Sequence, residues 1–327
     1  MFRPMLASVA LSSMLFAQAP QITTAYPQES TQNNNGNLVP FGCITGGSFA
    51  EGHTQVLIPP QHLPAPGGVL TAIGIHCQGT LSLTYPTLDI TMSPTTLTSL
   101  SSTFANNLSA PILVLNATNL TLTFSSNAWT WITLTTPYVH DGVSGLVIDI
   151  AKTVIPSSFA TMSTTSNPGR SDLPPMVYAF GTPGSGANTA TVGPYAASTL
   201  AVQLEWIGVP TIKLKSDPLG ANNNQFSVGG SIDHTIQGTP GSFFVNLIGL
   251  ALNNPPVLLP PVQGQFWVNG PTTNLGFLPP GGSSVMTIGI PPNPAFVGIY
   301  LTFQSLTSDA ISSVIQFTNA TDCFINS

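Results

Sequence analysis

The chain has 327 residues, of which 42% are apolar and only 5% are charged, and its formal net charge is −6. An average soluble domain carries roughly 25% charged residues, so this surface must consist mainly of uncharged polar side chains. Five Lys and Arg residues cannot neutralise a row of phosphates or hold an anionic membrane, which argues against nucleic-acid binding and polybasic membrane contact.

The N-terminus has the order of a secretory signal: a short positive start, an apolar run and small residues. Arg3 supplies the charge, Met5 to about Ala17 is apolar, and Ala17-Gln18-Ala19 follows. We therefore expect residues 1–19 to be a signal peptide. Pro20 is a poor first mature residue, so the sequence leaves the cleavage point open between residues 17 and 25.

This signal predicts a secreted protein, extracellular or at the cell surface. The mature chain has no apolar run long enough to span a bilayer, so no transmembrane segment is expected. Residues 20–37 include an Asn- and Gln-rich stretch, which favours a flexible polar lead before the folded part begins.

From residue 38 onwards, short β-branched and apolar runs alternate with Thr or Ser and are separated by Pro, Gly and Asn. Period-two patterning predicts strands buried on one face. Residues 38–208 are therefore expected to form a jelly-roll-like β-sandwich. The expected strands are 54–58, 69–75, 81–85, 88–92, 112–115, 120–124, 131–134, 146–150 and 200–206. A single helical turn or two is expected within residues 97–106.

Pro210 marks the expected boundary with a second strand-rich unit. Residues 209–327 have the size and strand number of an immunoglobulin-like β-sandwich. The expected strands are 211–215, 225–228, 242–247, 265–268, 285–290, 298–304 and 314–318. The fold class predicted from the sequence is thus all-β, with two successive antiparallel sandwiches.

Cys43, Cys77 and Cys323 are the three cysteines of the chain. In an oxidising compartment two of them can pair, and we favour a Cys43–Cys77 disulfide because both lie in the first unit. Cys323 is then expected to be buried and inert, with an intermolecular link as the alternative. The sequence contains no CxxC pair, so no zinc site is predicted.

Two stretches carry a family resemblance: Leu97 to Asn107, and Trp129 through Thr136-Pro-Tyr-Val-His-Asp-Gly142 to Ile150. Together they resemble a jelly-roll module of large secreted proteins of aquatic bacteria, although Gly145 stands where that family usually has Asn. The residues after Pro210 resemble a sandwich that often ends such proteins. The resemblance implies surface or matrix roles, and it brings no functional site to transfer.

No catalytic, cofactor or metal motif stands out. The five histidines lack a chelating spacing, and no G-x-S-x-G turn is present. Asp89 and Asp149 lie inside expected strands, and because a buried carboxylate is costly we expect both on the exposed face. Asp141 opens an Asp-Gly turn, whose chemistry alone explains the residue. A calcium ion bound at Asp141 is the one cofactor that the sequence allows. Calcium sites favour three clustered acids, and the sequence around Asp141 does not supply them.

Aromatic residues provide the sharpest binding hypothesis. Trp129 and Trp131 share one face of an expected strand, with Ile132 on the core face, so Trp131 is expected to be exposed and able to stack on a sugar ring. Trp131, Tyr138 and Asp141 are the predicted ligand-binding residues. The alternative is that Trp131 packs beneath a neighbouring loop.

Taken together, the sequence favours a non-catalytic surface or extracellular-matrix protein with a structural or adhesive role. Exposed sheet edges are usually protected by charge, and here charge is scarce, so self-assembly is the first partner hypothesis. A carbohydrate-binding module that recognises extracellular polysaccharide is the alternative. A glycan-acting hydrolase ranks third, because no clustered acid and base residues support it.

Overall fold

The computed structural model describes residues 22–26, 35–37, 40–42, 50–77, 79–126, 128–154, 162–166, 174–181, 198–217 and 226–327. These residues form mainly antiparallel β-sheets, one of them curled into a half-barrel, as the all-β prediction required. The helices among them are three short 3-10 turns, η1 (Pro60–His62), η2 (Phe104–Asn107) and η3 (Pro294–Phe296). None of the described helices is long and apolar enough to cross a membrane.

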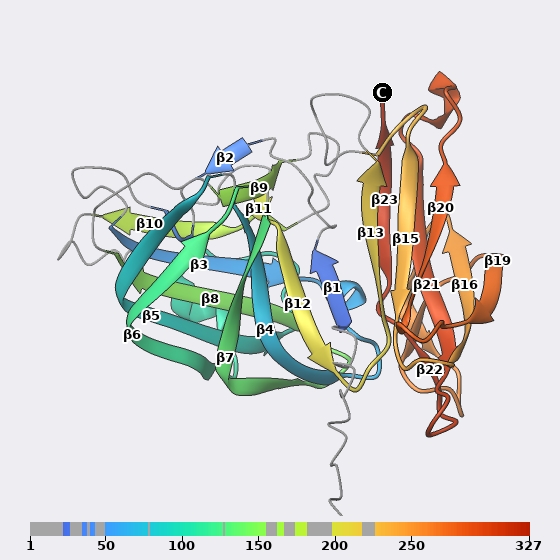
Figure 1. The fold of residues 1–327 in the computed structure, drawn as a ribbon, viewed down its shortest axis with the longest axis horizontal. Helices are drawn as coiled ribbons and strands as arrows, with labels where there is room; N and C mark the ends of the chain where they lie inside the picture. The colour runs from blue at the N-terminus through green and yellow to red at the C-terminus, as the bar shows by residue number, and fades with distance from the viewer. Residues whose placement is uncertain are drawn as a thin grey trace, which may run out of the picture.

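The larger unit contains two sheets that enclose one core (Figure 1). The first sheet has the order β10 (Val177–Gly181), β3 (Glu51–Ile58), β8 (Gly145–Thr153), β5 (Leu81–Thr95) and β6 (Ile112–Phe124). The second has the order β1 (Ile22–Tyr26), β12 (Val202–Ile207), β4 (Gly68–Cys77), β9 (Met162–Ser166) and β11 (Ser198–Leu200), with β7 (Ala128–His140) also on β4 and β2 (Asn35–Asn37) also on β9.

The core of this unit follows from alternation along long strands. On β5, Leu83, Tyr85, Leu88, Ile90 and Met92 are fully buried. The sequence predicts two strands here, yet β5 is continuous through Pro86. Its ladder to β6 keeps one register across that proline and shifts only between Ile90 and Thr91. The expected pair of strands at 112–115 and 120–124 is likewise the single strand β6.

The smaller unit also contains two main sheets. One has the order β13 (Thr211–Asp217), β15 (Ser231–Gln237) and β20 (Ser283–Gly289). The other has the order β14 (Phe226–Ser227), β23 (Thr321–Asn326), β21 (Tyr300–Ser308), β16 (Phe243–Gly249) and β19 (Thr272–Phe277), with β22 (Ile315–Phe317) also on β21. A hairpin of β17 (Leu252–Leu258) and β18 (Gln265–Val268) completes the unit. Ile212, Leu214, Phe244 and Phe303 lie in its separate core.

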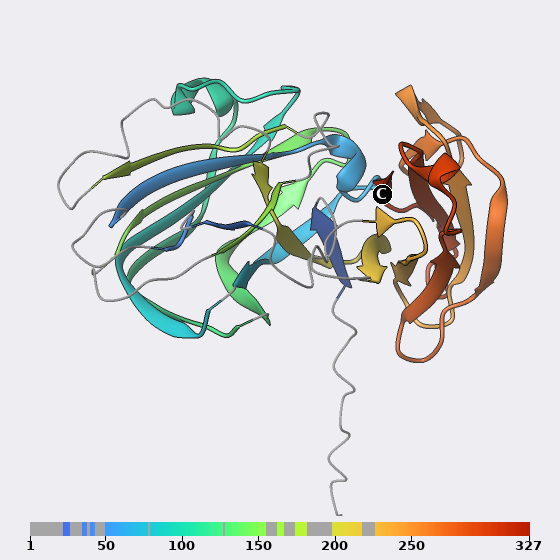
Figure 2. The same ribbon diagram turned by 90° about the horizontal axis from the view of Figure 1, so that it is seen from above.

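Strand β1 lies between the two units, as Figure 2 shows from above. The N–H and hydroxyl of Thr23 donate to Gln237 Oε1 at 3.0 and 3.2 Å, and the Thr211 hydroxyl donates to the Thr23 carbonyl at 3.0 Å. His62 Nε2 and Asp322 Oδ2, 3.9 Å apart, form a further buried contact between the units.

This arrangement corrects the expectation of a flexible lead at residues 22–26, while residues 20–21 and 27–34 of that lead lie outside the described residues. Ile22–Tyr26 pairs along its whole length with β12, and Tyr26 is 1% exposed in the main core. Ile22-Thr-Thr-Ala-Tyr26 lacks the alternation of a one-sided strand, because four of its five residues are buried.

Candidate functional site

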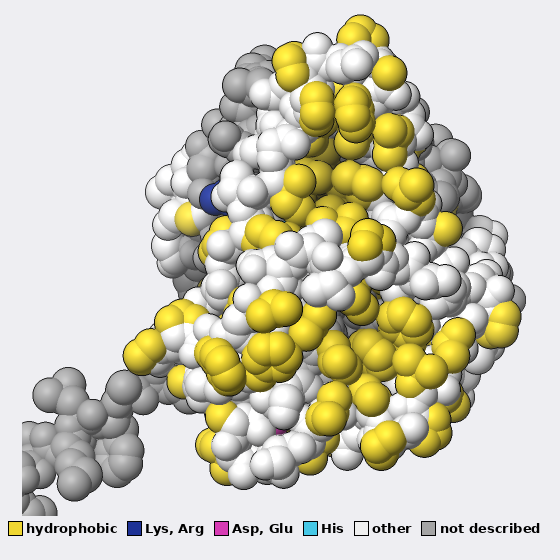
Figure 3. All heavy atoms as spheres, turned by 90° about the vertical axis from the view of Figure 1, so that its right-hand side faces the viewer, with side chains coloured by type: hydrophobic (Ala, Val, Ile, Leu, Met, Phe, Trp, Pro, Cys, Tyr) yellow, Lys and Arg dark blue, Asp and Glu magenta, His cyan; other side chains and the backbone are white. Residues whose placement is uncertain are grey.

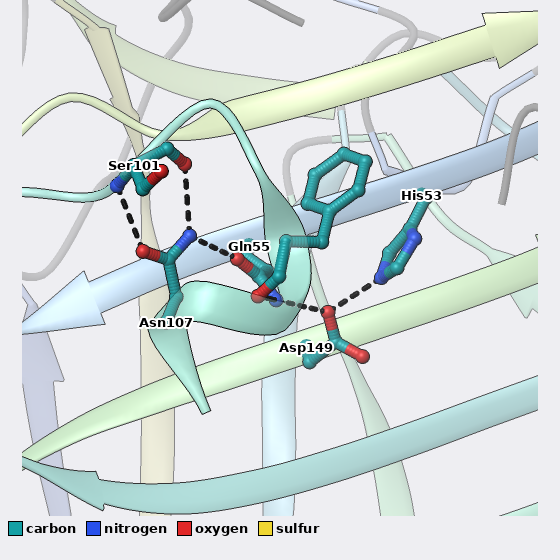
Figure 4. A network of polar contacts seen from close by, with 6 residues as sticks. His53, Gln55, Ser101, Asn107 and Asp149 are labelled. Atoms are coloured by element: carbon teal, nitrogen blue, oxygen red, sulfur yellow. Dashed lines mark hydrogen bonds and ion pairs between the residues drawn. The ribbon is translucent and has the colours of Figure 1, made fainter. Parts of the chain in front are cut away.

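A buried polar network lies on the side of β3 and β8 that faces away from the core (Figure 4). His53 Nε2 is 2.6 Å from Asp149 Oδ1, and the Gln55 amide donates to the same oxygen at 2.7 Å. The Asn107 amide donates to Gln55 Oε1 at 2.6 Å and to the Ser101 carbonyl at 2.9 Å. The loop that carries η2 thereby covers this side of the sheet.

Alternation on the two strands explains the position of the network. Val56 and Ile148 point into the core, so His53, Gln55 and Asp149 point to the opposite side. Asp149 is 8% exposed, which corrects the expectation that its carboxylate faces solvent. The cost of burying that carboxylate is offset by the two charge-assisted contacts it accepts.

The chemistry of this network suits support rather than catalysis. A His–Asp pair activates a nucleophile in acyl transfer. Here the His53 ring stacks on Phe104 with centroids 3.9 Å apart. The hydroxyl of Ser101, the one serine in the network, accepts from the Thr103 N–H at 3.1 Å within its own turn. The network therefore fixes the η2 loop to the sheet.

Trp131 lies on the outer side of the second sheet and is half-buried. It pairs with Gly74 on β4, and a Cβ built on Gly74 would be 3.1, 3.1 and 3.2 Å from three consecutive atoms of the indole six-membered ring. Nearly equal distances to three consecutive ring atoms mean that the ring face, and not its edge, covers Gly74. The opposite face of the indole points away from the sheet.

Tyr138 and Asp141 do not share a surface with Trp131. Tyr138 is 2% exposed and belongs to the core, on the other side of β7 from Trp131. Burial, followed by the nearby Asp141 charge, raises the pKa of Tyr138 to about 12. The three predicted ligand-binding residues therefore form no common groove, because the alternation of β7 places Trp131 and Tyr138 on opposite faces.

Asp141 is held by its own turn, as Asp-Gly turn chemistry predicts. Its Oδ1 accepts from the N–H groups of Val143 and Ser144, both at 2.8 Å, and its Oδ2 accepts from the Ser144 hydroxyl at 2.6 Å. Burial opposes ionisation, but these hydrogen bonds prevail and hold the pKa of Asp141 below its usual value. Asp141 borders a cavity of about 590 Å³ between the two units, which neither Trp131 nor Tyr138 lines.

The remaining sequence predictions concern the three cysteines and a metal site. Cys77 and Cys323 are buried, and the Cys77 thiol donates to the Gly79 carbonyl at 3.2 Å. Cys43 lies outside the described residues, so the proposed Cys43–Cys77 bridge stays a prediction. Within the described ranges, no group of three His, Cys, Asp or Glu side chains is placed to hold a metal ion.

The smaller unit exposes a set of apolar side chains that we call the outer apolar face: Phe243, Val245, Leu275, Phe277 and Leu306. In cross-strand register, Val245 on β16 lies between Leu275 on β19 and Leu306 on β21, and Phe243 pairs with Phe277. Leu275 is 60% and Phe277 is 70% exposed. Figure 3 shows hydrophobic side chains gathered over this side of the molecule, where charged side chains are scarce.

The β17–β18 hairpin covers only one end of the same sheet. Trp267 and Val268 pack there against Leu247 and Leu252, while the outer apolar face remains uncovered by described residues. The sequence explains the lack of charge, because residues 235–308 contain no Asp, Glu, Lys, Arg or His. That uncharged run is visible in the sequence alone, although the strand that carries Leu275 and Phe277 was not predicted.

No family model matches this chain, and neither a characterised protein nor a solved structure matches it. The resemblance to jelly-roll modules of secreted bacterial proteins therefore stays a prediction. Functional inference depends on the chain's own surfaces, of which the outer apolar face departs most from an ordinary protein surface.

Proposed function

We propose that the protein is an exported, non-catalytic surface or extracellular-matrix protein with a structural or adhesive role. The observation that carries the proposal is the outer apolar face. Monomeric soluble proteins rarely leave large contiguous apolar patches in water, and such patches commonly mark interaction sites. Here the patch spans three neighbouring strands, and no charged residue lies between positions 235 and 308.

Export fits the same picture. The N-terminal charge, apolar run and small residues suit a secretory signal, and an uncharged surface rich in Thr, Ser and Asn suits assembly outside the cell. We further propose a jelly-roll-like larger unit and an immunoglobulin-like smaller unit. Facing antiparallel sheets in both units, and the parallel pairing of β14 with β23 in the smaller one, support this finer description.

The test is the assembly state of the purified mature chain. Light scattering after size exclusion, over a hundredfold concentration range, is expected to show growth beyond the monomer, and electron microscopy is expected to show ordered assemblies. A monodisperse monomer at the highest concentration would contradict the proposal.

A second candidate function, carbohydrate binding, is favoured by Trp131. An indole that lies flat on a glycine presents its other face as a planar platform, which is how aromatic residues stack on sugar rings. Gln203, on the far side of Gly74 in the same row, has a buried amide nitrogen with no hydrogen-bond partner. The indole on β7 and the amide on β12 therefore lie on either side of Gly74 of β4.

Replacing Trp131 by Ala is expected to abolish retention on immobilised polysaccharide, whereas Trp131→Phe keeps an aromatic platform and is expected to retain part of it. A glycan array with calcium and with chelator identifies the ligand class and any role of the ion. Circular dichroism of both variants controls for folding. Equal retention by Trp131→Ala and the wild-type protein would rule out this function.

A further inference from the structure

Strand β19 is the terminal strand of its sheet, and its outer side has no neighbouring strand among the described residues. The Leu278 N–H donates to the Ser242 carbonyl, and the Gly241 N–H donates to the Leu278 carbonyl, both at 2.9 Å, so the polar groups of Leu278 point toward β16. Antiparallel strands alternate in this respect. The N–H and C=O groups of Leu275 and Phe277 therefore point outward.

Natural edge strands are protected by charged side chains, prolines, bulges or covering segments. Thr272-Thr-Asn-Leu-Gly-Phe277 contains no charge and no proline. A bulge opposite Asn246 and Leu247 lies at the beginning of the strand and leaves Asn274 to Phe277 in regular register. The second half of β19 thus keeps an open, unprotected edge.

From this edge we infer that two copies of the chain join by antiparallel pairing of their β19 strands about a two-fold axis near Leu275 and Gly276. This inference rests on the proposed function and names its partner. Pairing satisfies the outward N–H and C=O groups of Leu275 and Phe277 in both copies. It also joins the two outer apolar faces into one continuous surface, since Leu275 and Phe277 belong to both the edge and the face.

Charge favours a second copy over a different partner. The chain carries a formal charge of −6, so two copies repel one another wherever their acids approach. Residues 235–308 contribute none of that charge, and an antiparallel approach through β19 brings only uncharged strands together. A charged partner strand would lose hydration at this edge and find no counter-charge on β19.

The first experiment places a Lys on the edge of the full-length mature protein. Leu275→Lys and Phe277→Lys are each expected to lower the association constant at least tenfold in sedimentation equilibrium. Val139→Lys, at a 71% exposed apolar residue of β7, is the matched control and is expected to associate like wild type. Val285→Lys tests β20, the terminal strand of the other sheet, and is expected to have little effect.

The second experiment uses the two-fold axis, which brings identical residues of two copies together. Leu275→Cys is expected to give a covalent dimer with a short bifunctional thiol reagent, whereas Val139→Cys and the wild-type protein are not. Association that survives both β19 lysine variants, or that is lost only in Val285→Lys, would overturn the β19 inference and leave assembly standing. A monomeric wild-type protein would overturn the proposed function itself.

Discussion

The side chain of Asn107 connects the η2 loop to the sheet beneath it. Its amide donates to Gln55 and to the Ser101 carbonyl, and its own carbonyl accepts from the Ser101 N–H at 2.7 Å. Asn107 is 1% exposed, so these groups have no access to water as a substitute partner.

Replacing Asn107 by Ala is therefore expected to lower the free energy of unfolding by about 2–4 kcal/mol, because buried partners on Gln55 and Ser101 lose their hydrogen bonds. Asn116→Ala is the matched control: Asn116 is exposed and makes one hydrogen bond, to Asp89. Its expected effect is below about 0.5 kcal/mol. Urea unfolding of both variants measures the difference, and similar losses would show that the loop is not held by this residue.

For single residues, the sequence predicts which side of a strand a side chain takes, but it does not predict which segment covers that side. Trp131 was expected on the outer side of its strand, and β7 places it there. Asp149 was expected in water, because alternation placed it opposite the core. The structure keeps that side and adds a cover, the η2 loop, whose attachment through Asn107 to Gln55 joins residues 52 positions apart. No local pattern indicates such a contact.

Among the elements, β1 has an effect out of proportion to its five residues. It completes the second sheet of the larger unit and contacts the smaller unit through Thr23, which bonds to Gln237 and accepts from Thr211. A chain that starts at residue 22 keeps all of these interactions. A chain that starts at residue 27 loses them.

The chain that starts at residue 22 is expected to unfold like the mature protein. The chain that starts at residue 27 is expected to lose several kcal/mol of unfolding free energy, because Trp206 and neighbouring core residues become exposed. Differential scanning calorimetry is also expected to show separate transitions for the two units in the chain that starts at residue 27. A single transition at the original temperature in both would refute this role for β1.

Two of the strands that sequence patterns missed, β17 and β19, share one cause. β19 contains Gly276, β17 contains Pro255 and Pro256, and both are poor strand residues by intrinsic preference. Pairing with β16 and β18 overrides that preference. β13 and β18, which are richer in β-branched and aromatic residues, were predicted within two residues of their bounds.

For the whole molecule, two buried histidines predict how stability depends on pH. Burial lowers the pKa of His140, in the larger unit, to about 4, although nearby Asp141 opposes this. Burial likewise lowers the pKa of His234, in the smaller unit, to about 4. Both values lie below the unfolded value of 6.5. The unfolded chain therefore binds protons first, so stability is complete above pH 6.5 and falls as the pH drops toward 4.

Between pH 7 and pH 5 the expected loss is about 2 kcal/mol for each histidine, measured by urea unfolding at the two pH values. His234→Phe, which keeps an aromatic ring beside Phe303, is expected to lose about half of that pH dependence. The carboxylates with lowered pKa values, Asp141 and Asp309, titrate below this window and do not obscure it. An unchanged pH dependence in His234→Phe would contradict the prediction.

The uncharged smaller unit also has a consequence for proteolysis. Proteases of the trypsin type cleave after Lys or Arg, and the sequence contains neither between Lys215 and its last residue. Of the sites before that stretch, Lys152 is fully buried and Lys213 and Lys215 are half-buried in β13. Even after complete denaturation, tryptic digestion leaves residues 216–327, nearly the whole smaller unit, as one uncut fragment. Lys side chains protect the exposed sheet edges of many proteins, and Lys is also a residue after which these proteases cleave. The scarcity of Lys that leaves β19 unprotected therefore also removes the cleavage sites.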